Sequence, residues 1–197
     1  PYTIYCGCNY KGQKINYSRC MYEPTTASKR EHRLEWEHIV PVSNFGSKFK
    51  SWKNSHPRCK KRSGTPYKGR RCARIVSKKF RLMEADLHNL APAIGSVNEK
   101  RSNFDIGIVP EFVTSIPGCK TKIYAGKIEP RVEVRGMIAR TYLYMDNAYP
   151  KMGIIYEKKR EMINMWNKKH PPTNFERIRN RKIGNVQGNL NPFVEMR

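Results

Sequence analysis

Residues 35 to 41 read EWEHIVP, in which two glutamates flank a tryptophan and a histidine follows the second glutamate. A carboxylate beside an imidazole, whose unperturbed pKa is about 6.5, suits metal-assisted hydrolysis with a base that works near neutral pH. Adjacent side chains of a strand point to opposite faces, so Glu37 and His38 can share a site only if the strand ends or bends there. Pro41 is consistent with such an end. For this stretch in isolation, an ion-paired Glu37 and a hydrogen-bonded core His38 are the simpler interpretation.

The charge of the chain points to a polyanionic partner. Its 197 residues include 39 lysines and arginines but only 16 aspartates and glutamates, a net charge of +23. That excess is more than solubility requires, and it opposes compaction through self-repulsion. Nucleic acid is the first candidate, because lysine and arginine contacts to phosphates release counterions and give affinity without sequence preference. A hydrophobic content of 38% with 11% aromatics favours a folded core over a disordered basic tail.

The basic residues are concentrated after the opening motif. Between His38 and Met83 there is no aspartate or glutamate, while 14 lysines and arginines occur. We interpret this stretch as a long, disulfide-tied basic loop that forms a phosphate-binding surface, rather than as a solvated run of charge.

Six cysteines without any C-x-x-C pair indicate disulfides rather than a zinc knuckle or a thioredoxin-like motif. Disulfides imply a periplasmic, extracellular or other oxidising compartment. Six cysteines allow 15 connectivities. Our hypothesis pairs Cys59 with Cys72, and gives Cys20 and Cys119 one each of Cys6 and Cys8. With no initiator Met and no apolar run near 18 residues, we expect a soluble mature form without a membrane segment.

Further along the chain, periodicity predicts several elements. A short helix is expected to start near Pro92 and to carry Asn98, with a turn at NLAP before it. Residues 104 to 130 read as strands and turns. Two amphipathic, core-facing helices are predicted within 132–145 and 157–170. Neither an internal repeat nor a linker divides the chain, so we expect one domain over residues 1–197.

Three long motifs together resemble the bacterial endonuclease I family of secreted or periplasmic nonspecific nucleases. They are LEWEHIVPVSNFG at 34–46, FRLMEADLHNLAPAIGSVNEKRSNF at 80–104 and IGNVQGNLNPFV at 183–194. The resemblance implies an α+β fold, a single mixed domain built around a ββα-metal (His-Me finger) motif at about 34–104 and stapled by disulfides.

The resemblance also assigns roles by position. Glu37 and Asn98 are implied as the protein ligands of one Mg²⁺, a site that Mn²⁺ or Ca²⁺ can also occupy. His38 is implied as the general base that deprotonates the attacking water. The arginine that holds the phosphate falls on Arg70 within KGRRC, with Arg71 as the alternative.

Three neighbours receive supporting roles. Glu84 resembles an acidic position near the family's site, and we expect it outside the ligand set, holding a metal-bound water. Glu35 is expected to support the site and Trp36 to pack in the fold.

The function implied is in-line hydrolysis of phosphodiester bonds by a monomer, with little sequence specificity. DNA is the expected substrate, and RNA is left open as a second one. The alternative is a non-enzymatic, basic secreted protein that binds nucleic acid, which gives no reason for combining E-W-E-H with the distant asparagine. A zinc enzyme using His38, His56 and His88 is a weaker third hypothesis, because their spacing matches no helix-face ligand pattern.

Overall fold

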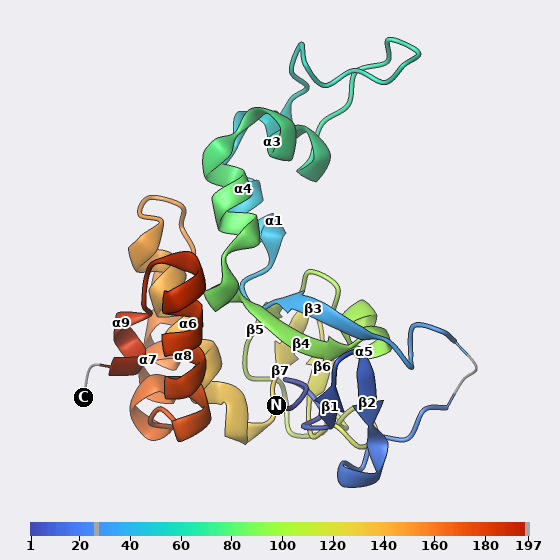
Figure 1. Cartoon of the computed structure of the whole chain (residues 1–197), viewed down its shortest axis with the longest axis vertical. Coiled ribbons are helices and arrows are strands. Elements are labelled where there is room, and N and C mark those ends of the chain that lie inside the picture. The colour runs from blue at the N-terminus through green and yellow to red at the C-terminus, as the bar shows by residue number, and fades with distance from the viewer. Residues whose placement is uncertain (26–27, 196–197) are drawn as a thin grey trace.

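The computed structural model describes residues 1–25 and 28–195, and it has the expected α+β architecture (Figure 1). Its strands are short and fall into separate small sheets. The first pairs β1 with β2, the second β3 with β4, and the third has the order β5-β7-β6. Their bounds are β1 Asn9–Lys11, β2 Lys14–Asn16, β3 Leu34–His38, β4 Leu90–Ile94, β5 Asp105–Ile106, β6 Lys122–Tyr124 and β7 Lys127–Glu129.

In Figure 1 one group of helices lies above the central β3–β4 pair and another lies to its left, while α5 lies beside the pair. In the sequence α1 to α4 lie between β3 and β4, α5 follows β4, and α6 to α9 follow the third sheet. Their bounds are α1 Val42–Gly46, α2 Lys50–Lys53, α3 Arg70–Val76, α4 Lys78–Ala85, α5 Gly95–Arg101, α6 Arg135–Ala148, α7 Glu157–Lys169, α8 Asn174–Gln187 and α9 Pro192–Glu195.

The β3–β4 pair and α5 form the ββα unit of the fold. The strands are antiparallel, with Glu37 opposite Ala91 and His38 opposite Leu90, and α5 begins directly after β4. The helix predicted near Pro92 therefore starts three residues later, at Gly95, and the predicted NLAP turn leads into the strand. Pro92 fits in β4 because its nitrogen, which has no hydrogen to donate, faces away from β3. On that same side its carbonyl accepts a hydrogen bond from the Ile4 backbone N–H.

The basic segment after β3 is only partly the loop that the sequence predicted. It contains α1 to α4, and the Phe80 ring of α4 packs against the rings of Phe45, Phe49 and Trp52 at 5.4 to 5.9 Å. Residues 54–69 are the irregular part, and they extend from the top of the molecule in Figure 1. The difference has a physical cause. Helices of four to eight residues are too short to show a clear hydrophobic period in the sequence, and aromatic packing rather than helix propensity stabilises them.

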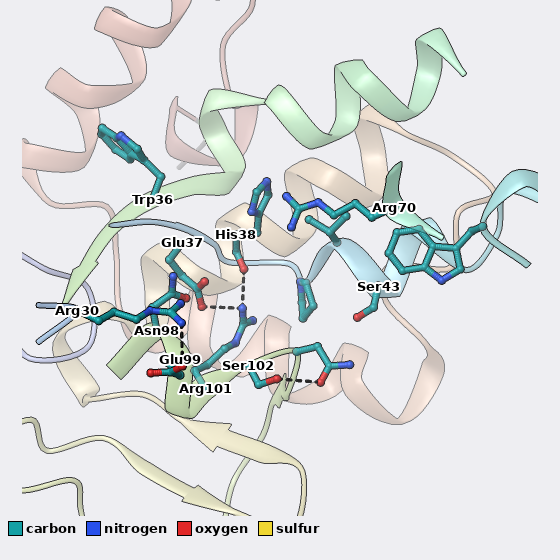
Figure 2. A pocket seen from close by; sticks show the side chains of 14 residues that line it. Arg30, Trp36, Glu37, His38, Ser43, Arg70, Asn98, Glu99, Arg101 and Ser102 are labelled. Carbon is teal, nitrogen blue, oxygen red and sulfur yellow. Dashed lines mark hydrogen bonds and ion pairs between the residues drawn. The ribbon is translucent and has the colours of Figure 1, made fainter. Parts of the chain in front are cut away.

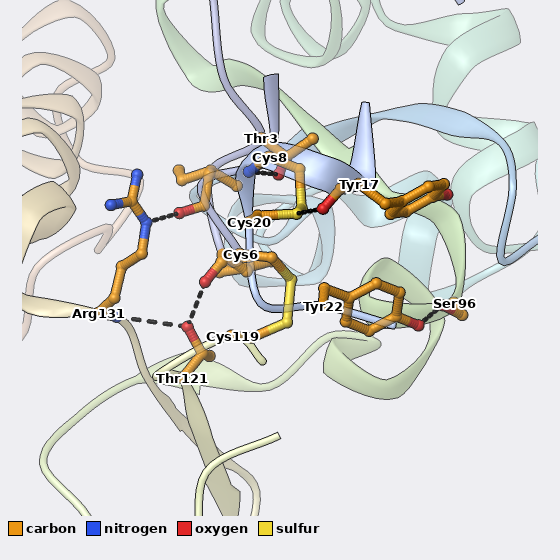
Figure 3. The surroundings of a disulfide bond; sticks show 12 residues. Thr3, Cys6, Cys8, Tyr17, Cys20, Tyr22, Ser96, Cys119, Thr121 and Arg131 are labelled. Carbon is orange, nitrogen blue, oxygen red and sulfur yellow. Dashed lines mark hydrogen bonds between the residues drawn. A yellow bond between two sulfur atoms is a disulfide. The ribbon is translucent and has the colours of Figure 1, made fainter. Parts of the chain in front are cut away.

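The predicted Cys59–Cys72 disulfide is confirmed, and of the two arrangements left open for the other four cysteines the structure has Cys6–Cys119 and Cys8–Cys20. Cys6–Cys119 joins residues 113 apart and ties the N-terminal segment to the chain just before β6 (Figure 3). Cys59–Cys72 closes the irregular basic segment onto α3. In the chain-entropy view a bridge over such a short loop stabilises the fold by roughly 3 kcal/mol.

The two amphipathic helices are also confirmed, as α6 and α7. Buried residues of α6 include Arg140, whose guanidinium makes two hydrogen bonds to the buried Glu176 carboxylate of α8 at 2.6 and 2.7 Å. Thr173 caps α8 by accepting a hydrogen bond from the Glu176 amide. Within residues 1–25 and 28–195, every helix is too short or too polar to span a bilayer.

Candidate active site

One cleft of about 520 Å³ is lined by the residues that the sequence assigned to catalysis and metal binding, Glu37, His38, Arg70 and Asn98. The end of β3 supplies Glu37 and His38, α5 supplies Asn98 and Arg101, and the first residue of α3 is Arg70 (Figure 2). Because β3 ends at His38, the adjacent Glu37 and His38 side chains both line this cleft. The ββα unit thus joins side chains from positions 37 to 98 in a single site.

The His38 ring is oriented by a backbone carbonyl. Its Nε2 lies 2.8 Å from the carbonyl oxygen of Glu84, at the end of α4. A carbonyl can only accept, so Nε2 carries the proton and Nδ1 is left with its lone pair. Burial lowers the pKa of His38, and the positive charge of Arg70 lowers it further. The hydrogen bond to the Glu84 carbonyl raises the pKa but does not cancel this effect. The imidazole is therefore neutral at pH 7 and able to accept a proton at Nδ1.

The Glu37 carboxylate is buried, with 4% of the residue exposed. Its Oε1 accepts a hydrogen bond from the Tyr5 hydroxyl at 2.7 Å and lies 2.6 Å from the guanidinium of Arg101. Burial raises the pKa of Glu37, and the charge of Arg101 works against that rise. Arg101, only 1% exposed, also donates to the carbonyls of His38 and Ile39 at 2.7 and 2.8 Å. One buried cation therefore fixes both the carboxylate and the end of β3.

Asn98 is oriented by Glu35, two residues before Glu37. The Asn98 amide nitrogen donates to Glu35 Oε2 at 2.9 Å, which leaves the amide oxygen Oδ1 for another partner. Glu35 is itself bound by Arg30 and Arg33. Gly95 permits this close approach, because a Cβ there would lie 2.8 Å from Glu35 Oε1 and 2.4 Å from the Arg30 carbonyl oxygen. Glu35 thus has the supporting role that the sequence predicted.

These residues fit a hard divalent cation. Glu37 offers a carboxylate oxygen and Asn98 an amide oxygen in the same cleft, which is a suitable set for an ion such as Mg²⁺ that keeps several waters. In the described ranges, histidine, cysteine, aspartate and glutamate form no group of three that could hold a metal. The zinc hypothesis therefore has no cluster of ligands in these ranges. The Nε2 of His88 instead lies 3.1 Å from the carbonyl oxygen of Asn189.

The arginines of KGRRC differ in position. Arg70 lines the cleft, whereas the Arg71 guanidinium lies 4.8 Å from the centre of the Tyr67 ring. The Nε of Arg70 is 2.5 Å from the Glu84 carboxylate, to which Arg74 also donates at 2.7 Å. Burial would raise the pKa of Glu84, but these arginines outweigh it and lower the pKa.

Glu84 lies outside the proposed ligand set, as predicted, and its holding of a metal-bound water stays a prediction. It is not among the residues that line the cleft, and its carboxylate binds two arginines. Its contributions are to position Arg70 through the carboxylate and His38 through the backbone carbonyl.

The sequence reasoning overlooked Arg101 and Tyr5, and it misplaced Trp36. Arg101 follows Asn98 by three residues on the same helix, a spacing that indicates a shared helix face but no role in the site. Tyr5 reaches Glu37 from 32 residues away and carries no local signal. Trp36 is 60% exposed, so the prediction that it packs in the fold is wrong.

Comparison with known proteins gives a consistent result. The family model described as Endonuclease I matches residues 2–197. An extracellular deoxyribonuclease of Aeromonas hydrophila is 36% identical over 99% of this chain and 82% of its own length. Endonuclease-1 of Buchnera aphidicola subsp. Acyrthosiphon pisum (strain APS) is 40% identical over 98% and 74%, and a periplasmic deoxyribonuclease of A. hydrophila 36% over 99% and 78%. Three disulfides and relatives from outside the cytoplasm agree on an oxidising, periplasmic or extracellular location.

Proposed function

The chain belongs to the endonuclease I family and is a nuclease, and we propose that it hydrolyses phosphodiester bonds in DNA with one Mg²⁺ and with little sequence preference. The observation that carries this proposal is a single juxtaposition. A neutral, carbonyl-oriented His38 shares a cleft with the oxygen donors of Glu37 and Asn98.

In the proposed mechanism, His38 Nδ1 takes the proton from the attacking water. The Glu84 carbonyl keeps the ring in the orientation and tautomer that this step needs. Glu37 and Asn98 would hold the divalent ion. When bound, such an ion supplies stabilisation of the negative charge that develops on the phosphate and on the departing 3′-oxygen.

Arg70 is proposed to bind the phosphate that is cleaved. Its contact with Glu84 uses Nε, a geometry that leaves the terminal nitrogens to donate to phosphate oxygens. In Figure 2 the guanidinium of Arg70 points toward His38, so a phosphate bound there would lie beside the base.

Electrostatic recognition of the backbone predicts a steep dependence on salt. With a net charge of +23, we expect kcat/KM for a supercoiled plasmid to fall at least tenfold, or about 1.4 kcal/mol, between 50 and 200 mM salt. The measurement is an initial-rate series in NaCl at constant Mg²⁺. A flat profile would count against phosphate-driven binding.

Removing either proposed ligand is expected to change the metal dependence. Glu37→Ala and Asn98→Ala should each raise the Mg²⁺ concentration for half-maximal cleavage by at least roughly tenfold, because each removes one oxygen donor. The matched control is Glu99→Gln, since Glu99 lines the same cleft but its carboxylate is 61% exposed and pairs with Arg30. The ligand assignment fails if Glu37→Ala keeps the wild-type Mg²⁺ dependence.

A further inference from the structure

Trp36 lies between two hollows of the surface. It is flanked on β3 by Glu35 and Glu37, and strand alternation sends its side chain to the opposite face from theirs. Figure 2 shows the indole pointing away from Glu37. Trp36 nevertheless lines both the catalytic cleft and a second groove of about 330 Å³. The two hollows therefore adjoin at one exposed aromatic side chain.

The second groove is mainly apolar and is bordered by α8. Phe175, Ile178 and Val186 line it at helical spacing, and Ile178 and Val186 are 39% and 78% exposed. The same helix buries Glu176 and Asn180, which do not line the groove. Near the N-terminus, Tyr2 packs its ring 4.9 Å from that of Phe175 on the same groove. α8 thus presents an apolar stripe to solvent beside the active site.

The rim of this groove is cationic. Lys182 on α8 and Arg179 one turn before it are both among the lining residues. Arg179 is held in place by the carbonyls of Leu87 and Leu90, at 2.6 and 2.7 Å. A phosphate gains nothing from an apolar surface, but the flat face of a nucleobase does. The two cationic side chains suit the phosphates attached to that base.

We propose that Trp36 is a stacking platform for an unpaired nucleobase of the strand being cleaved. The base would enter the second groove while its neighbouring phosphodiester occupies the catalytic cleft. This inference rests on the proposed nuclease function and deepens it. In a duplex the bases stack on one another, so only a single-stranded or locally melted segment can place a base in the groove. Stacking on an indole is tolerant of sequence, since every base has a π-face.

A binding experiment tests the platform without cleavage. The probes are a single-stranded thymidine 12-mer and an abasic 12-mer with the same number of phosphates, added to the protein in EDTA. We expect the thymidine probe to quench tryptophan emission, the abasic probe to quench it far less, and Trp36→Phe to lose this difference. Trp52 and Trp166 remain in that variant, and because Trp52 lines the catalytic cleft, the Trp36 signal is the part of the quenching that differs between the wild type and Trp36→Phe. Equal quenching by the two probes, or a difference that persists in Trp36→Phe, overturns the proposal.

A kinetic comparison tests the same contact during turnover. Trp36→Ala should lower kcat/KM for a single-stranded oligonucleotide by about tenfold, as expected for one stacked base. The loss should disappear on an oligonucleotide with a single abasic residue beside a unique cleavable phosphodiester. An equal loss on both substrates overturns the stacking role.

Failures of the two proposals can be told apart. If neither substrate is cleaved in Mg²⁺ while Trp36 is still quenched, the nuclease mechanism fails and base binding stands. If cleavage is normal and Trp36 reports no base, only the platform fails. Burial of Trp36 in a dimer, detected as an emission shift that follows protein concentration and sedimentation, would give the groove to a second copy and would also overturn it.

Discussion

His38→Ala is expected to lower kcat/KM for plasmid cleavage by roughly 100- to 10,000-fold, the usual contribution of a general base. The variant should still bind DNA and keep its fold, because the ring makes one hydrogen bond, to the Glu84 carbonyl, and its removal leaves Glu37 and Arg101 in place. Initial rates at saturating Mg²⁺, a gel shift in EDTA and a thermal melt measure the three properties separately.

The control for this variant is His32→Ala. His32 is exposed, lies outside the cleft and contacts the Tyr17 ring edge-on at 6.1 Å. It should cleave at the wild-type rate. If His38→Ala also cleaves at that rate while remaining folded, another group is the base.

Arg101→Met is expected to lower the free energy of unfolding by about 3 to 5 kcal/mol, the usual consequence of leaving one partner of a buried ion pair uncompensated. The pair is almost completely buried, with side-chain exposures of 1% for Arg101 and 5% for Glu37. The two carbonyls at the end of β3 lose their donor as well. Because the Glu37 carboxylate then lacks its cation, Mg²⁺ should restore more stability to this variant than it adds to the wild type. Urea unfolding with and without Mg²⁺ measures both effects.

The matched control is Arg140→Met. Arg140 and Glu176 form a second buried pair with the same exposures, 1% and 5%, between α6 and α8 rather than in the cleft. A comparable loss of stability is expected there, but without a specific gain from Mg²⁺ and without a change in the Mg²⁺ concentration needed for cleavage. The assignment of Arg101 as the residue that positions Glu37 fails if both variants respond to Mg²⁺ alike.

The part of the site that the sequence predicted is the part carried by local pattern. Adjacent Glu37 and His38 required a strand end, and β3 ends at His38. The position of Asn98 was expected from the family motif, and α5 brings it into the same cleft. By contrast, the Glu84 carbonyl that orients His38 is a backbone atom 46 residues away. Every residue has such a carbonyl, so sequence alone cannot single one out.

The wrong predictions for Pro92 and Trp36 both concern contacts with residues that are distant in the sequence. Pro92 was assigned to a helix because proline is favourable in a first turn, but it is equally tolerated where a strand faces away from its partner. Trp36 was expected to pack in the fold, yet the face of β3 to which it points is open enough to leave the residue 60% exposed. In both cases the neighbours across space, rather than the local sequence, decide the outcome.

The central claim is that hydrolysis depends on a divalent ion held by Glu37 and Asn98. The most direct test is to treat the protein with EDTA, remove the chelator, and measure nicking of a supercoiled plasmid and a gel shift during titration with Mg²⁺. We predict DNA binding at every step, no cleavage before the addition of Mg²⁺, and full recovery of cleavage with it. Cleavage that continues undiminished in EDTA, or binding that never leads to cleavage in Mg²⁺, would contradict this account.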